Sequence, residues 1–363
     1  MSMHIEATTA RAAATGTAAA RAGSCPTRLE AALLRHRVLI CVVLLHLAGG
    51  IAVSTMNERS FETGVVPILL GVFKTLVVVF GCNFLLWRTG YGLFVAKPRR
   101  LTLWLAGDLK RCLRNTEMMA DGLIVFVTVT IMAATFAYLK DMVPVLNPFS
   151  WDPAFAALDR FLHGGIDPWR LLWPVFGNTV LTTALNVAYH LWFFMLYMMV
   201  FIATFDRRDP LRRMTFLLAF VLTWIIGGNV LATVFSSAGP VYNQILGFGD
   251  TYVAQMDGLK ALNETSPVWS LGIQEMLIGN YLADGPIRGI SAMPSMHVAN
   301  AVLMAVFGFT YARWLGWILT GFAALIMIAS VHLAWHYAVD GYLGAALALA
   351  FWWIAKRLAA RFP

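Results

Sequence analysis

Two histidines and one aspartate lie where apolar stretches of this sequence begin. His297 lies in the run GISAMPSMHVANA, and His336 lies in ASVHLAWHYAVDGYLG with Asp340 four residues after it. Ionisable side chains placed against membrane segments are costly and are usually functional. One imidazole can attack phosphorus and form a covalent intermediate, while a second can protonate the leaving oxygen. Because a carboxylate one turn away can hold the attacking ring in its reactive tautomer, the three residues suit phosphoryl transfer.

Two predicted helix starts would bring these side chains together. Pro294 can open a helix, since its missing N–H is not needed there, and it places His297 in the first turn. His336 and Asp340 are spaced to face the same side in the first turns of a later helix. Helix N-termini present free N–H groups and partial positive charge, so they favour a phosphate between them. Ser295, near the first start, could donate its hydroxyl or its backbone N–H to that phosphate.

The composition places this chemistry in a membrane. The chain has 363 residues, of which 59% are hydrophobic and 13% charged, and its mean hydropathy is +0.70. Soluble domains carry about 25% charged residues, so we predict a polytopic membrane protein. The net charge is +8, but the Lys and Arg residues lie in short loops between helices, where they indicate orientation rather than nucleic-acid binding. The four cysteines show neither CxxC nor metal-ligand spacing, so we expect no disulfide framework and no zinc site from them.

Apolar segments recur at the length that a bilayer core demands, roughly 15–25 residues. Such lengths exclude strands, because open sheet edges cannot face lipid. We therefore predict an all-α membrane bundle of about eight transmembrane helices, with a six-helix phosphatase- or phosphotransferase-like core. The eight predicted segments are 38–56, 65–87, 121–139, 179–205, 214–235, 296–312, 315–332 and 338–355.

We divide the chain into three parts. Residues 1–34 are predicted to be a disordered cytoplasmic tail, since they are rich in Ala, Thr and Arg without apolar periodicity. Residues 35–120 would add two helices and a basic cytoplasmic loop, and residues 121–355 would form the catalytic domain. Within that domain, the connection 140–178 carries Pro, Gly and Asp punctuation that suggests short surface helices. The connection 236–290 is also long, and such loops are usually functional.

The basic residues also predict an orientation. With the N-terminus inside, the inside segments hold 20 Lys and Arg residues and the outside loops hold 6. Basic residues collect on the cytoplasmic side of membrane proteins. We therefore expect both termini in the cytoplasm of a cell inner or plasma membrane, with His297, His336 and Asp340 on the outer face.

The two motifs resemble a known superfamily. PSMH followed by HYAVD is similar to the second and third signature motifs of the type 2 phosphatidic acid phosphatases, over about residues 140–355. This resemblance implies hydrolysis or transfer of lipid-linked phosphates without a metal or other cofactor. It also implies that His336 is the nucleophile, Asp340 its orienting partner and His297 the general acid.

Departures from the superfamily motifs favour one reaction, transfer, over hydrolysis. The positions seven and six residues before the nucleophile, usually Ser-Arg, hold Ala329 and Ser330. The first motif, a Lys and an Arg-Pro pair, is replaced by SSAGPVY, which ends at Tyr242. This pattern is similar to the inositolphosphotransferase branch, the inositol phosphorylceramide synthases, and implies transfer to an alcohol. We include Tyr242 among the candidate substrate-binding residues.

Without the basic motif, another cation must bind the phosphate. Arg288, six residues before Pro294, is the first candidate, and Lys260 is the second. A metal site is a separate alternative to the covalent-histidine mechanism, because His332, His336 and Asp340 form an HxxxHxxxD series that would make a ligand stripe on one helix. The chain must turn close to His332, however, so we predict no metal site.

Two other functions stay open at this point. A lipid phosphate or polyprenyl diphosphate phosphatase would use water in place of the alcohol. A non-catalytic lipid-binding or transport protein could use the same bundle. In each case the expected partners are the bilayer and a phospholipid or lipid-linked phosphate, and no nucleic acid.

Overall fold

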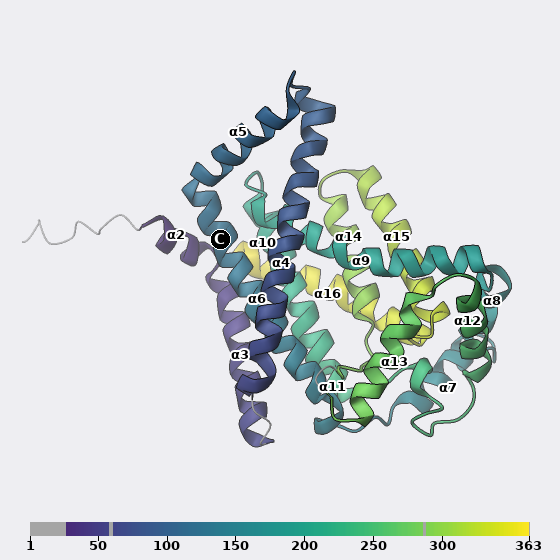
Figure 1. The fold of residues 1–363 in the computed structure, drawn as a ribbon. Coiled ribbons are helices and arrows are strands. Elements are labelled where there is room, and N and C mark those ends of the chain that lie inside the picture. The colour runs from purple at the N-terminus through teal and green to yellow at the C-terminus, as the bar shows by residue number, and fades with distance from the viewer. Residues whose placement is uncertain (1–26, 58–60, 286–287, 363) are drawn as a thin grey trace, which may run out of the picture.

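The computed structural model describes residues 27–57, 61–285 and 288–362. Within these ranges the chain forms helices joined by loops, and no strand. Figure 1 shows long helices that cross one another at different inclinations, with the short helices of the two long connections gathered at one end. The predicted fold class, an all-α membrane bundle, is confirmed.

Each of the eight apolar segments is a helix. In the described part of the chain, seven helical spans are long and apolar enough to cross a membrane. They are α3 (Arg37–Met56), α6 (Thr116–Leu146), α9 (Thr179–Phe205), α15 (Arg313–His332), α16 (Ala338–Arg361), the span Phe73–Ala96 in α4 (Phe61–Tyr91) and η1 (Gly92–Ala96), and the span Pro210–Val234. The last of these comprises α10 (Pro210–Leu222), the π-helical turns η2 (Thr223–Leu231) and α11 (Ala232–Val234).

The remaining segment, 296–312 and sixth in the chain, is shorter than predicted. Helix α14 (Met296–Phe309) has 14 residues and ends before the predicted limit at 312. Helices rise by 1.5 Å per residue, so it is ~21 Å long, against a hydrocarbon core of ~30 Å. The chain before it, residues 289–295, is not helical but is largely buried among the other elements.

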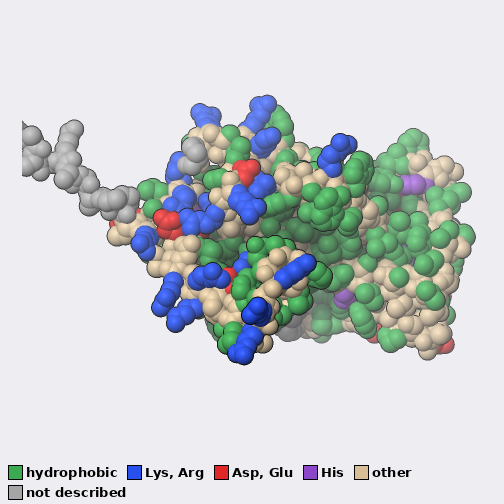
Figure 2. All heavy atoms as spheres, turned by 90° about the horizontal axis from the view of Figure 1, so that it is seen from above, with side chains coloured by type: hydrophobic (Ala, Val, Ile, Leu, Met, Phe, Trp, Pro, Cys, Tyr) green, Lys and Arg blue, Asp and Glu red, His purple; other side chains and the backbone are tan. Residues whose placement is uncertain are grey.

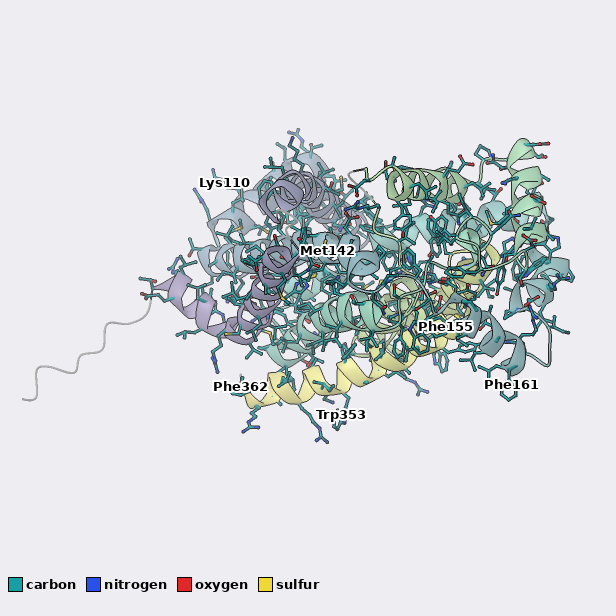
Figure 3. All side chains as sticks on the ribbon, turned by 90° about the horizontal axis from the view of Figure 1, so that it is seen from below. Lys110, Met142, Phe155, Phe161, Trp353 and Phe362 are labelled. Carbon is teal, nitrogen blue, oxygen red and sulfur yellow. The ribbon has the colours of Figure 1, made fainter. Side chains whose placement is uncertain are left out.

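Short helices occupy the two long connections. The connection 140–178 contains α7 (Asp152–Leu162) and α8 (Pro168–Phe176), as its punctuation predicted. The connection 236–290 contains the single turn η3 (Pro240–Tyr242), α12 (Val253–Thr265) and α13 (Trp269–Leu282). Helix α7 lies against the bundle by one face: Phe155 is 6% exposed, whereas Phe161 is 80% exposed and stands at the rim in Figure 3.

The N-terminal helices are attached to the core by polar contacts. Residues 1–26 of the predicted tail lie outside the described residues, and the rest of it forms α2 (Arg28–Arg35), whose N-terminus has a Thr27–Glu30 capping box. Buried Asp121 on α6 bonds to Arg35 and His36 and lies 3.6 Å from Arg213 of α10. This carboxylate therefore joins three helices.

A second polar contact lies within the bundle. His46 of α3 is 2.9 Å from the side-chain oxygen of Asn229 in η2, whose amide nitrogen donates to the carbonyl of Phe136. The division at residue 120 stays a prediction, but α3 is joined directly to helices on both sides of that boundary.

Basic side chains are concentrated at one end. Figure 2 shows Lys and Arg gathered on the half of the face that carries α2, η1 (Gly92–Ala96) and α5 (Leu101–Arg114). Lys110 marks this region in Figure 3. The gathering agrees with the loop charges counted in the sequence.

Helices α14 and α16 approach closely where the two motifs meet. A Cβ on Gly344 of α16 would lie 2.6 Å from the carbonyl oxygen of Ser295, the residue that caps α14. The backbone N–H of Ser295 in turn donates to the carbonyl of Asp340 at 2.9 Å. Glycine at position 344 thus permits the contact that brings PSMH beside HYAVD.

Candidate active site

His336 lies in the turn between α15 and α16. It precedes α16 by two residues, so the prediction that it lies within the helix is wrong: Tyr337, with φ −65° and ψ 156°, is the extended cap. The ring nitrogen Nδ1 lies 3.3 Å from Oδ2 of Asp340, which also accepts the backbone N–H of Tyr337 at 2.9 Å. Asp340 is fully buried. With Nδ1–H donated to the carboxylate, Nε2 is the nitrogen left with a lone pair.

The protonation state of His336 suits a nucleophile. The ring is 7% exposed. Burial, together with the positive charge of Lys140, lowers the pKa of His336 to about 3. The imidazole is therefore neutral at physiological pH, and its lone pair is available.

His297 occupies the first turn of α14, as predicted. Its ring stacks on Tyr189 of α9 at a centroid distance of 4.1 Å and lies 4.2 Å from the ring of Trp192. The ring centroids of His297 and His336 are 6.2 Å apart. Among the described residues, His297 has no hydrogen-bond partner, so the two aromatic rings fix its plane while its nitrogens stay available to a ligand.

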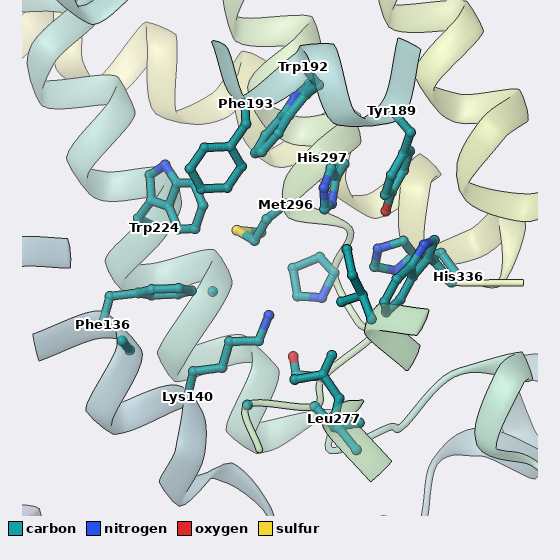
Figure 4. A pocket seen from close by; sticks show the side chains of 18 of the residues that line it. Phe136, Lys140, Tyr189, Trp192, Phe193, Trp224, Leu277, Met296, His297 and His336 are labelled. Atoms are coloured by element: carbon teal, nitrogen blue, oxygen red, sulfur yellow. The ribbon is translucent and has the colours of Figure 1, made fainter. Parts of the chain in front are cut away.

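Both histidines line one cavity of about 560 Å³. Lys140, near the end of α6, points into it from the opposite side (Figure 4). Much of the remaining wall is apolar and includes Phe136, Trp192, Phe193, Phe220 and Trp224. The cavity thus has one polar end and one aromatic end, which suits an amphipathic ligand.

Asp152 organises the run that replaces the basic motif. Its carboxylate accepts the Ser237 hydroxyl at 2.9 Å and the backbone N–H groups of Ala238 and Gly239 at 2.9 and 2.8 Å. It also accepts the hydroxyl of Tyr337 at 3.0 Å. One side chain at the start of α7 therefore positions Ser236–Tyr242 against the residue that follows His336.

Asp159, two turns further along α7, caps α16. Its two carboxylate oxygens accept the N–H groups of Ala338 and Val339 at 2.7 and 2.8 Å. The expectation that free N–H groups at this helix start bind a phosphate is therefore wrong, because carboxylates already occupy them. Burial raises the pKa of Asp159, and the two donated N–H groups oppose that rise.

Two further sequence candidates, Tyr242 and Ser295, have different positions. Tyr242 lines the cavity and donates its hydroxyl to the carbonyl of Gln274 at 3.1 Å. Ser295 is fully buried: its hydroxyl accepts the N–H of Val298, so it caps α14 and does not line the cavity. Since its own N–H is donated to Asp340, the structure leaves that group unable to bind a phosphate.

The two predicted cations lie elsewhere. Arg288 donates to Asp141 at 2.9 Å and pairs with Asp284, and it does not line the cavity. Lys260 is exposed on α12 and borders a separate hollow of about 220 Å³. Neither residue reaches the two histidines.

His332 is separated from the other members of the HxxxHxxxD series. It is the last residue of α15, and its Nε2 lies 2.9 Å from the Thr182 hydroxyl. As the sequence predicted, the chain turns after His332, and residues 333–337 interrupt the single helix that an HxxxHxxxD ligand stripe would require. Within the described ranges, no three His, Cys, Asp or Glu side chains form a group that could hold a metal ion.

Sequence reasoning missed Lys140, Asp152, Asp159 and Tyr189. In the sequence, Lys140 is one of the six basic residues of the predicted outside loops, where it indicates only orientation. The two aspartates carried a usable signal, because they lie seven residues apart in the otherwise apolar run DPAFAALD, where a helix would place both on one face.

The comparisons agree with the motifs. A family model described as the PAP2 superfamily matches residues 153–354, which is more than half of the chain. No curated protein and no solved structure gives a match. The matched region includes His297, His336 and Asp340, while Lys140 and Asp152 lie before it.

Proposed function

The chain belongs to the PAP2 superfamily of membrane phosphatases and phosphotransferases, and from this premise we propose that it transfers a phospho-head group from a lipid to an alcohol. One observation carries the proposal. The buried His336–Asp340 pair faces His297 across 6.2 Å, in a cavity whose remaining wall is largely apolar.

The proposed reaction has two steps. In the first, Nε2 of His336 attacks phosphorus, a P–N bond forms, and the P–O bond to the first lipid breaks. His297 gives a proton to the departing oxygen, and Asp340 stabilises the positive charge that develops on His336. In the second step the acceptor hydroxyl returns its proton to His297, a new P–O bond forms and the P–N bond breaks.

Two departures from the phosphatase motifs favour an alcohol acceptor. The run Ser236–Tyr242 replaces the basic first motif, and Ser330 replaces the arginine before the nucleophile. Both replacements resemble the inositolphosphotransferase branch. Ser330 is 1% exposed, and its carbonyl accepts the N–H groups of Trp335 and His336. It therefore stabilises residues 333–337, the nucleophile turn that carries His336. The aromatic wall could hold a lipid chain from either substrate.

The proposed site faces the outer side of the membrane. This placement rests on the basic residues, 20 of which fall in the segments assigned to the cytoplasm against 6 outside. The substrates would then be lipids that reach the outer leaflet.

The test uses purified protein in lipid nanodiscs. A phospholipid labelled in its head-group phosphate is supplied with and without a long-chain alcohol. We expect label in the alcohol and an acid-labile, alkali-stable phosphoprotein. The variant His336→Ala should lose both. His163→Ala is the matched control, since His163 contacts Tyr342 and does not line the cavity.

Three results would contradict the proposal in different ways. Release of phosphate or phosphoalcohol at the same rate without acceptor would identify a phosphatase. Full turnover by His336→Ala would remove the nucleophile assignment. Lipid binding without turnover under any condition would favour a non-catalytic role.

A further inference from the structure

The cavity that holds the two histidines has one formally charged side chain. Of the residues that line it within the described ranges, none is Asp, Glu or Arg, and Lys140 is the single lysine. The carboxylate nearest to the reacting ring, Asp340, is fully buried behind His336 and does not line the cavity. Three imidazoles also line the cavity, those of His190, His297 and His336, so Lys140 is the one lining side chain of the described residues whose positive charge does not depend on imidazole protonation.

Lys140 has no partner that would neutralise it. In the part of the chain that the structure describes, its ammonium makes no ion pair or hydrogen bond with the protein. Its Nζ lies 5.8 Å from the centroid of the Phe136 ring. A buried or half-buried ammonium without a carboxylate is costly, so a site that keeps one is built for an anionic ligand.

The backbone around Lys140 makes room for the side chain. A Cβ on Gly289 would lie 3.3 Å from Cγ and 3.4 Å from Cδ of Lys140, tighter than ordinary van der Waals contact. The neighbouring basic residue, Arg288, is held by Asp141 and is thereby kept outside the cavity. These contacts direct Lys140, and not Arg288, toward the histidines.

We propose that Lys140 binds the phosphate of the substrate and supplies the positive charge that the Ser236–Tyr242 run lacks. The inference rests on the proposed function. As phosphorus passes from one oxygen to His336, negative charge stays on its non-bridging oxygens. A fixed ammonium in a low-dielectric cavity stabilises that charge far more than it would in water. Lys140 lies before the residues that the family model matches, so α6 adds it to the core motifs.

An alternative role is structural. A lysine near the end of a membrane helix often extends its charged group to water and packs only through its methylenes. Such a lysine would affect stability and would have no effect on anion affinity. The view into the cavity shows the Lys140 side chain extending from α6 into the space on whose far side His297 and His336 lie (Figure 4).

The test measures binding of orthovanadate, an anion that mimics the transferring phosphoryl group. Isothermal titration calorimetry is run on the full chain in nanodiscs for wild type, Lys140→Met, Lys140→Arg and Lys260→Met. Hydrogen bonds to charged groups contribute about 1.5–3 kcal/mol, so Lys140→Met should weaken vanadate by about 10- to 100-fold. Lys140→Arg should recover part of that loss, and Lys260→Met should bind like wild type.

Two controls make the outcome specific. Dodecanol, an uncharged probe of the aromatic wall, should bind Lys140→Met as tightly as it binds wild type. A Lys140→Met protein that loses both ligands has lost its fold. In that case, Lys140→Arg that binds dodecanol normally supports the inference if it also binds vanadate, and contradicts it if it does not. Unchanged vanadate binding by folded Lys140→Met would overturn the inference while leaving the histidine mechanism intact. Wild type that binds vanadate yet turns over no phospholipid would instead contradict the proposed function.

Discussion

The hydroxyl of Tyr337 donates a hydrogen bond to the carboxylate of Asp152 at 3.0 Å, across 185 positions of sequence. Tyr337 is adjacent to the proposed nucleophile, and Asp152 also holds the backbone of Ala238 and Gly239. Because the two loops share one acceptor, the cavity wall and the nucleophile turn are positioned together. Helix α7, which no catalytic motif includes, is therefore part of the support of the site.

Replacing Asp152 should uncouple these loops. Asp152→Asn keeps the shape but offers an amide donor to groups that are themselves donors. Each hydrogen bond to the charged group contributes about 1.5–3 kcal/mol, so we expect at least about a tenfold fall in kcat/KM and a lower Tm. Asp250→Asn, on an exposed side chain, is the control. Wild-type turnover by Asp152→Asn would show that the shared acceptor is dispensable.

Gly239→Ala tests the contact between Ser236–Tyr242 and the turn before His336. Gly239 has φ +101°, and a Cβ there would lie 2.6 Å from the carbonyl oxygen of Trp335. Gly247 has φ +80° with nothing within 4 Å, so Gly247→Ala carries the backbone strain alone, about 1–3 kcal/mol. We expect both variants to lose stability in thermal unfolding and only Gly239→Ala to lose most of its activity. Equal activity in the two would remove the steric argument.

Asp340→Asn separates orientation from charge. An asparagine oxygen can still accept from His336 and Tyr337, but it cannot stabilise the imidazolium that forms as His336 attacks. We expect kcat to fall by about 10²- to 10⁴-fold with little change in KM. Rapid-quench kinetics should show slow formation of the phosphoprotein. A rise in KM with unchanged kcat would assign Asp340 to substrate binding.

The neutral state of His336 predicts a dependence of stability on pH. Its pKa is about 3 in the folded protein, and about 6.5 in an unfolded chain. Between these values the unfolded state binds more protons, so the free energy of unfolding contributed by this residue falls as pH falls from 6.5 toward 3. At pH 5 the loss should be about 2 kcal/mol.

The comparison of wild type with His336→Gln isolates this contribution. Thermal unfolding in nanodiscs at pH 7 and pH 5 should show a larger loss of Tm in wild type than in the variant, because the other titrating groups are common to both. Equal losses would mean that His336 titrates alike in the folded and unfolded chains.

Much of the fold was predictable because the length of an apolar segment depends only on residues that are neighbours in sequence. All eight apolar segments became helices near the expected residues, and the turn after His332 was anticipated from the end of the apolar run. The His336–Asp340 contact was also predictable, since a spacing of four residues brings side chains together around a helix start. These features depend on neighbours in sequence.

The supporting residues depend on distant partners and could not be found in that way. Asp159 binds N–H groups 179 and 180 positions away, and nothing local to α7 identifies them. Arg288 looked suitable because it stands near PSMH, but Asp141 on another element holds it. Lys140 carried the same signal as any basic residue at a segment end. Only the packing of α6 against the other helices directs it inward.

The shortness of α14 also bears on how the irregular chain before it can lie within a membrane. Irregular backbone at membrane depth is tolerated where protein covers it or where it lines a cavity, and residues 289–295 do both, with Ile290 and Ala292 at most 2% exposed. A helix ~9 Å shorter than the hydrocarbon core therefore leaves no irregular backbone exposed to lipid before it, because the protein covers the segment that precedes it.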